Sequence, residues 1–264
     1  AEPGDILFDL YQDASSETAD VIFSVGNNEY KAHKSILCLR CKKLFDIAKE
    51  YGPHQSIPIQ STSAEVFKSI LDFAYTMKLP NIKNKDIATE LLVAADIYEA
   101  VQLKLYVESI IVYTLLTPQT AAELLLFADS HSCALLKEEA TTFFVTDAAA
   151  VKNSKAWPQI KESPKLVVEL LDTTMPASKE YKDDDLTEAF DQMNIVTIRE
   201  ELELFNLELD GSREILVERL KIYHGSKNEE KTKEDEVVDD GDDGDDGDDG
   251  DDGDDDDNDD NPEE

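Results

Sequence analysis

The chain has 264 residues, enough for one large or two smaller domains, and its 60 Asp and Glu against 25 Lys and Arg give a formal net charge of −35. This charge excludes non-specific binding to nucleic acid or to anionic membranes, because both need clustered cationic side chains. Basic proteins are the partners that it favours.

Cysteine usage indicates the compartment. The chain has three cysteines and no Asn-x-Ser/Thr sequon, which is typical of an intracellular, reducing setting, either nucleus or cytoplasm. No apolar run approaches a membrane span, and no signal peptide precedes Ile6. Because the first residue is Ala1 and not Met, we expect the chain to be the C-terminal piece of a longer protein.

The first predicted element is a short amphipathic helix from Asp5 to Gln12. Its apolar side, which has no obvious partner within the chain, consists of Ile6, Leu7, Leu10 and Tyr11. An unpartnered apolar side at the start of the chain predicts contact with a second copy.

A hairpin that leads into helices is predicted next. Apolar residues alternate from Val21 to Val25, Gly26 to Asn28 supply a turn, and Tyr30 to Ala32 return as the partner strand. The apolar period then changes from two to about 3.6, which predicts helices from Ser35 to Glu50. Ser56 to Ile59 is expected to be an edge strand, because its proline cannot donate to a sheet.

Helices are predicted for most of the following chain. Thr62 to Glu65 has the spacing of a capping box, so we expect Thr62 to cap a helix and its loss to cost about 1 kcal/mol. Thr117 and Pro118 predict a cap and a first-turn proline. Trp157 is a predicted core anchor. The further helices are expected at residues 86–99, 101–115, 118–128, 137–150 and 165–171.

Several segments of the first 172 residues resemble a BTB/POZ domain followed by the helical extension called BACK or three-box, as in speckle-type POZ proteins. These segments are Ala19-Asp20-Val21, Ala32-His33-Lys34, Ala94 to Tyr98, Leu103-Lys104, Ala121 to Ser132 and Ala156-Trp157. The resemblance implies an α+β, mostly helical fold with a small sheet flanked by helices. It also implies a homodimer formed through the first helix, with Ile6, Leu7, Leu10 and Tyr11, and docking to a cullin 3 scaffold for substrate ubiquitination.

The cullin contact of that family is an apolar residue, any residue and then Glu, just after the helix that holds Arg40. Without a gap this chain has Ile47-Ala48-Lys49 there, and with a shift of one residue it has Ala48-Lys49-Glu50. Both depart from the motif. The candidate contact residues are therefore Ile47, Ala48 and Glu50.

A second resemblance, to the SAP motif, covers residues 198–220. Its small core would contain Leu202, Leu207, Leu216 and Leu220, with a turn and cap at Gly211-Ser212. Members of that family often bind DNA through basic residues, which here would be Arg199, Arg213 and Arg219. From Met193 to Tyr223, however, four basic residues stand against seven acidic ones. A protein-binding or structural role is thus at least as well supported as DNA binding.

The C-terminal sequence contains five Asp-Asp-Gly repeats from Asp239 to Gly253 and almost nothing apolar, which predicts disorder. It would act as a solubilising polyanion, as a docking arm for histones or other basic proteins, or as a DNA mimic. The expected organisation is a BTB/POZ domain at 1–116, BACK-like helices at 117–174, a linker at 175–185, a SAP-like helical unit at 186–224 and a disordered acidic tail without helical periodicity at 225–264.

No pattern of residues predicts catalysis, a metal site or a cofactor. Cys38 and Cys41 have CxxC spacing but no second pair, so we expect Cys38 to be a packed helix residue. His33 is expected to stabilise the junction between hairpin and helix. The chain is therefore predicted to be a non-enzymatic, homodimeric interaction scaffold and an adaptor of a cullin 3 type ubiquitin ligase. The alternative is a chromatin-associated or histone-binding protein that acts without a ligase.

Overall fold

The computed structural model describes residues 18–52, 55–82, 84–174 and 186–236. The predicted first helix, the predicted linker and the Asp-Asp-Gly repeats lie outside these residues. Contacts divide the chain into two units, residues 1–222 and 223–264. The sheet and all helices up to Ile222 belong to the first unit, and the last helix continues past Ile222.

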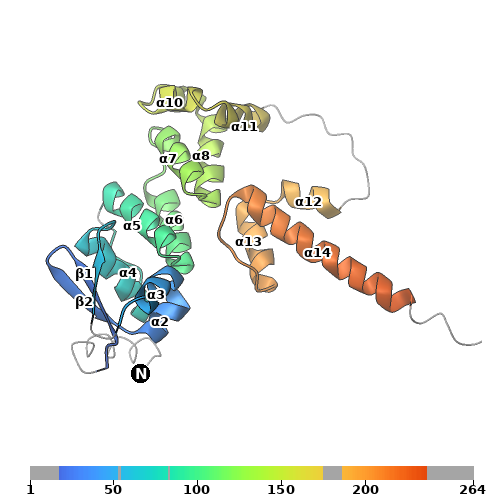
Figure 1. Ribbon diagram of the computed structural model, residues 1–264. Coiled ribbons are helices and arrows are strands. Elements are labelled where there is room, and N and C mark those ends of the chain that lie inside the picture. Colours follow the sequence, from blue (N-terminus) through green and yellow to red (C-terminus); the bar gives the residue numbers. More distant parts are fainter. Residues whose placement is uncertain (1–17, 53–54, 83, 175–185, 237–264) are drawn as a thin grey trace, which may run out of the picture. The chain divides into compact units, whose positions relative to one another are not determined.

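A three-stranded sheet lies at the start of the described chain (Figure 1). Strand β1 (Val21–Val25) is central, with β2 (Asn28–Ala32) antiparallel on one side and β3 (Ser56–Ile59) parallel on the other. Gly26 has a φ of 59°, as the first central residue of a two-residue II′ hairpin turn requires. The predicted hairpin and edge strand are thus confirmed.

Five helices pack with this sheet. They are α2 (Lys34–Arg40), α3 (Lys42–Lys49), α4 (Ala64–Thr76), α5 (Lys85–Ile97) and α6 (Val101–Thr114). The core contains an aromatic group in which the Phe67 ring lies 5.4 Å from that of Phe23 and 6.0 Å from that of Tyr98. The apolar sides of β1 and α4, read from the sequence, meet in this core.

The cap of α4 is one residue later than predicted, so the capping role expected of Thr62 is wrong. The side chain of Ser63 accepts a hydrogen bond from the N–H of Val66 at 3.4 Å. Thr62 is instead buried, and its hydroxyl is hydrogen-bonded to that of Tyr98 at 3.0 Å. The local spacing allows either Thr62 or Ser63 to cap the helix. Because the hydroxyl of the distant Tyr98 binds Thr62, Ser63 is the cap.

Helical hairpins follow the first core. They comprise α7 (Ala121–Ser130), α8 (Ala134–Thr146), α9 (Ala148–Lys152), α10 (Trp157–Lys161) and α11 (Pro164–Thr174). Trp157 is half-buried and stacks on Phe144 with the ring centroids 5.5 Å apart, so it packs as predicted.

The first-turn position predicted for Pro118 is wrong, because α7 begins at Ala121. The Thr120 hydroxyl donates to the Leu115 carbonyl at 2.8 Å and fixes the preceding turn.

A third set of helices forms the C-terminal helical unit, defined here as residues 186–222. It contains α12 (Leu186–Gln192), α13 (Ile195–Leu204) and the start of α14 (Arg213–Glu236). Leu202, Leu216 and Leu220 are fully buried in its core together with Ala134 and Leu135 of α8. The unit therefore shares a core with α8.

Helix α14 ends at Glu236, whereas the sequence predicted loss of helical structure from residue 225. Residues 226–236 lack apolar periodicity but consist mainly of Glu and Lys, both strong helix formers. A helix that is already nucleated by a packed first turn extends at little cost into such a sequence. The prediction of disorder for residues 225–236 is corrected accordingly.

Candidate interaction surfaces and a buried charge network

Helix α2 exposes Leu39, which the sequence periodicity places among the apolar positions of the helix. Leu39 is 78% exposed, and Ile36, one helical turn earlier, is only half-buried. Cys38 is also exposed, so the packed position predicted for it is wrong. The four residues predicted for the dimer interface, Ile6, Leu7, Leu10 and Tyr11, lie outside the described residues.

The candidate cullin contact lies at the end of α3. Ala48 is fully buried and Ile47 is half-buried against the same core, while Glu50 is exposed. Lys49 forms an ion pair with Asp46 at 2.6 Å and lies over the Phe45 ring at 4.6 Å. The structure therefore leaves Glu50 and part of Ile47 accessible, and keeps Ala48 in the core.

His33 joins the hairpin to α4. Its Nδ1 lies 2.8 Å from the Tyr75 hydroxyl, which also accepts the backbone N–H of His33 at 2.8 Å. Its Nε2 lies 3.1 Å from the Thr18 hydroxyl. Burial raises the pKa of Tyr75, so this hydroxyl stays protonated. These bonds give His33 a fold-stabilising position.

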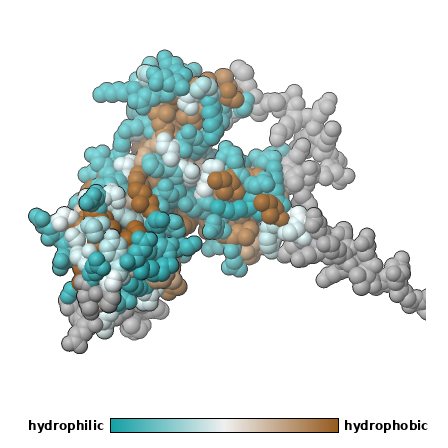
Figure 2. Space-filling view, in the orientation of Figure 1, coloured by the Kyte–Doolittle hydropathy of each residue, from teal (hydrophilic) through white to brown (hydrophobic). Residues whose placement is uncertain are grey.

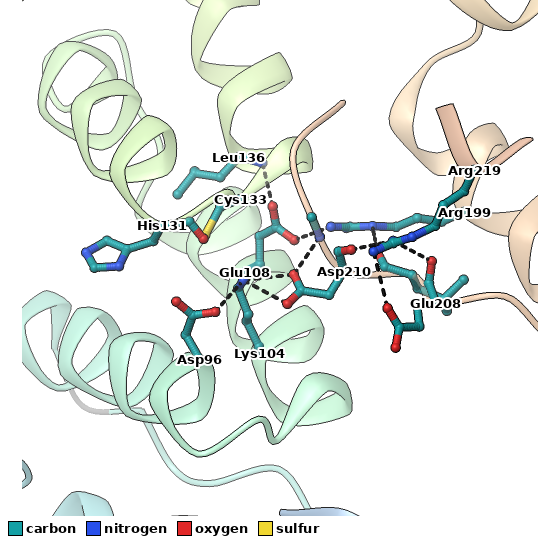
Figure 3. A network of polar contacts seen from close by, with 12 residues as sticks. Asp96, Lys104, Glu108, His131, Cys133, Leu136, Arg199, Glu208, Asp210 and Arg219 are labelled. Atoms are coloured by element: carbon teal, nitrogen blue, oxygen red, sulfur yellow. Dashed lines mark hydrogen bonds and ion pairs between the residues drawn. The ribbon is translucent and has the colours of Figure 1, made fainter. Parts of the chain in front are cut away.

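A network of polar contacts joins the C-terminal helical unit to the preceding helices (Figure 3). Glu108 of α6 is 1% exposed and pairs with Arg199 of α13 at 2.8 Å. The second oxygen of Glu108 accepts the backbone N–H of Leu136 at 3.1 Å. One buried carboxylate thus joins helices α6, α8 and α13.

Lys104, one helical turn before Glu108, forms the second half of the network. Its side chain is 3% exposed, and the ammonium group lies 2.7 Å from Asp96 and 2.8 Å from Asp210. Burial acts to lower the pKa of Lys104, but the hydrogen bonds to Asp210 and Asp96 outweigh it and the net shift is upward. Lys104 therefore remains charged and bridges α5 to the loop before α14.

The loop around Gly211 completes the contact. Gly211 forms a parallel backbone bridge with Cys133, and its φ is 135°. A Cβ at this position would lie 3.1 Å from the Ile215 side chain, so glycine is needed both for conformation and for space. Cys133 is buried, and burial raises its pKa, which makes the thiol unreactive.

All three SAP-like arginines make contacts within the chain. Arg213 pairs with Glu138 at 3.0 Å and donates to the carbonyls of Asp191 and Met193. Arg219 donates to the carbonyl groups of Glu208 and Asp210 at 2.9 and 2.6 Å. Together with the Arg199 pair, these bonds direct the guanidinium groups toward the protein.

The sequence contained one signal for this network that was missed. Lys104 and Glu108 lie four residues apart on α6, among positions that otherwise bury apolar side chains. Charged residues on a buried face are rare unless they are paired. Their partners could not be found from spacing, because Asp210 and Arg199 come about a hundred residues later.

A hollow of about 510 Å³ lies beside the C-terminal helical unit and is lined by residues of α8, α11, α12 and α14 and by the turn between α12 and α13. Its two cationic lining residues are already paired, Lys137 with Asp129 and Glu169 at 2.7 Å each and Arg213 with Glu138. Within the described part of the chain, no cluster of three or more His, Cys, Asp or Glu side chains is placed to hold a metal ion. No described helix is long and apolar enough to span a membrane.

Comparison with known proteins identifies the first part of the chain. Residues 10–115 match the BTB/POZ domain family. Mouse TD and POZ domain-containing protein 3 is 32% identical over 169 residues, which are 62% of this chain and 46% of that protein. Mouse TD and POZ domain-containing protein 4 is 31% identical over 166 residues, 61% and 45% respectively. The chain thus spans a little under half the length of these relatives.

A solved structure, the BTB domain of zebrafish PATZ1, is 26% identical and corresponds to 42% of this chain and 92% of that chain, with a TM-score of 0.36.

Proposed function

We propose that this chain is a homodimeric adaptor of a cullin 3 type ubiquitin ligase, because residues 10–115 match the BTB/POZ domain family and such a domain is a protein–protein interaction scaffold. The observation that carries the dimer is the exposed face of α2. Leu39 and Ile36 lie three residues apart on one side of that helix, and Leu39 is 78% exposed. The predicted first helix would supply the remaining apolar side chains.

The energetics favour a two-fold interface at this face. A two-fold interface buries each residue twice, once per copy. Full burial of a leucine side chain contributes roughly 1.5–3 kcal/mol, so Leu39 and its symmetry mate supply a substantial part of a dimer's free energy. Other apolar side chains are also exposed, among them Leu204 of α13 at 72%, and hydrophobic residues gather on the C-terminal helical unit in Figure 2.

The dimer is tested by sedimentation of charged variants. Leu39→Asp should weaken self-association by about tenfold or more, because it buries two carboxylates in one interface. Tyr113→Asp is the matched control, since Tyr113 is 83% exposed on α6 and lies outside the proposed face. Equal association of the two variants would contradict the assignment of α2.

The ligase role rests on the resemblance of Ile47 to Glu50 to the family's cullin contact. In the ungapped alignment, Lys49→Glu restores the apolar-x-Glu motif and should strengthen capture by purified cullin 3. In the shifted alignment Glu50 is the acidic residue, and Glu50→Lys should abolish capture. No binding of the unaltered chain and of Lys49→Glu above background would reject the ligase role but would leave the dimer in place.

A second candidate function is association with histones or other basic proteins in chromatin. It is favoured by the charge of the chain and by the inward direction of Arg199, Arg213 and Arg219, which leaves acidic groups at the surface of the C-terminal helical unit. We expect salt-sensitive binding to histones and no tight binding to DNA. Tight DNA binding by the full chain, lost in Arg213→Ala, would contradict this candidate.

Intracellular localisation is part of the same proposal, since all three thiols are free.

A further inference from the structure

Helices α2 and α3 form a basic region in an otherwise acidic protein. Residues 31–49 contain six Lys and Arg and a single acidic residue, whereas the whole chain has a net charge of −35. Lys42 and Lys43 are both exposed at the start of α3. This local excess of positive charge is independent of the proposed dimer and ligase roles.

The contacts around these cations differ. Lys49 pairs with Asp46, and Arg40 donates to the Gln102 side chain at 2.9 Å. Within the described part of the chain, neither Lys42 nor Lys43 has an ion pair. Their charges are therefore directed to solvent.

Their position in α3 is unfavourable for the helix. Lys42 and Lys43 are its first two residues, next to the positive end of the helix dipole, and the first turn has no acidic residue. The preceding residue, Cys41, makes no side-chain cap. By contrast, α4 and α5 begin with capping side chains from Ser63 and Asn84 and have an acidic residue in the first turn.

An apolar residue adjoins the cations. Arg40 contacts Gln102, and the neighbouring Val101, the first residue of α6, is 37% exposed. The N–H of Lys43 donates to the carbonyl of Tyr98 at 3.3 Å, which places the start of α3 beside the α5–α6 junction. Arg40, Lys42, Lys43 and Val101 thus belong to one surface, called the basic surface below.

We propose that the basic surface binds an acidic segment of another protein, with an apolar side chain of that segment against Val101. Charge complementarity supports this occupant, because neither lysine forms an ion pair within the described residues and both oppose the helix dipole. Nucleic acid would extend beyond the basic surface and meet the acidic remainder of the chain. Interactions with a short acidic segment remain local, since salt screens charges within about 8–10 Å.

The test uses the full chain and a fluorescent synthetic peptide of Glu and Asp with leucine at every fourth position. Lys42→Glu/Lys43→Glu should weaken peptide binding about tenfold or more at physiological salt, with little change in melting temperature. The control is Lys155→Glu/Lys161→Glu, which makes the same change in net charge at two exposed lysines away from the basic surface. It should bind the peptide as the unaltered chain does.

Four results would overturn the proposal. The first is equal peptide binding by the two variants, and the second is equal binding of a peptide in which Gln and Asn replace the acids. The third is peptide binding that appears only after residues 227–264 are removed, because the occupant would then be the chain's own acidic sequence. The fourth is the absence of any peptide binding by the unaltered chain.

Discussion

The cations of the C-terminal helical unit and those at the start of α3 have opposite surroundings. Arg199, Arg213 and Arg219 all bond to carboxylates or carbonyls, and Arg199 reaches a carboxylate that is 1% exposed. Lys42 and Lys43 have no ion pair within the described residues and point to solvent. The number of basic residues in a motif therefore does not show that the motif binds a partner. Only their contacts separate cations that hold the fold from cations left for a partner.

The largest effect should come from breaking the buried pair. Arg199→Ala leaves Glu108 buried without its counter-ion, and we expect a loss of roughly 3–5 kcal/mol in the free energy of unfolding. Urea denaturation measures this loss. The double variant Arg199→Leu/Glu108→Leu should recover much of it, because no unpaired charge remains. A loss below about 1 kcal/mol in Arg199→Ala would contradict the view that Arg199 stabilises the fold whereas Lys42 and Lys43 do not.

A smaller effect is expected at Lys104, with a dependence on pH. Lys104→Met leaves Asp96 and Asp210 without their shared ammonium group and should cost roughly 1–3 kcal/mol at neutral pH. The pKa of Lys104 is raised on folding above the ordinary value of 10.5, so its contribution is complete below pH 10.5 and is lost as pH rises through the folded-state pKa. Unfolding curves between neutral and strongly alkaline pH should therefore converge for the unaltered chain and Lys104→Met. Parallel curves would contradict the role given to this ammonium group.

Substitutions of exposed charged residues in the C-terminal helical unit should change the free energy of unfolding far less. Lys221 pairs with Asp191 at 3.1 Å, but the two side chains are 29% and 49% exposed. Exposed pairs contribute about 0–1 kcal/mol, so Lys221→Ala should have an effect in that range that disappears at high salt. An effect equal to that of Arg199→Ala would show that burial does not explain the comparison.

The smallest effect is expected at the basic surface. Lys43→Gln removes an unfavourable contact with the helix dipole and a favourable one with Asp46, and the two should offset each other to within about 0.5 kcal/mol. Thermal unfolding beside Lys155→Gln checks this expectation. A clear loss of stability in Lys43→Gln alone would mean that this lysine serves the fold.

How far the sequence predicts the structure depends on whether its signals are local. The hairpin and β3 could be placed because alternation, a Gly-Asn turn and Pro58 act within a few residues. The cap of α4 was misplaced by one residue because the distant Tyr98 hydroxyl binds Thr62. The charge network was missed for the same reason on a larger scale, since Lys104 meets Asp210 only after the chain has folded.

The residues of the candidate surfaces could likewise be predicted only where the signal is local. The position of Ile47 to Glu50 near the end of α3 could be read from the motif, but burial of Ala48 depends on packing against the sheet core. Exposure of Leu39 also depends on packing, because on periodicity alone it is one of the apolar positions of α2. Sequence patterns indicate which residues are apolar, whereas the fold determines which of them remain accessible.

The central claim, that this chain is a homodimer, is tested most directly by the mass of the unaltered full chain in light scattering at micromolar concentration. We predict twice the chain mass of 29.5 kDa. A mass of 29.5 kDa throughout the micromolar range would contradict the claim.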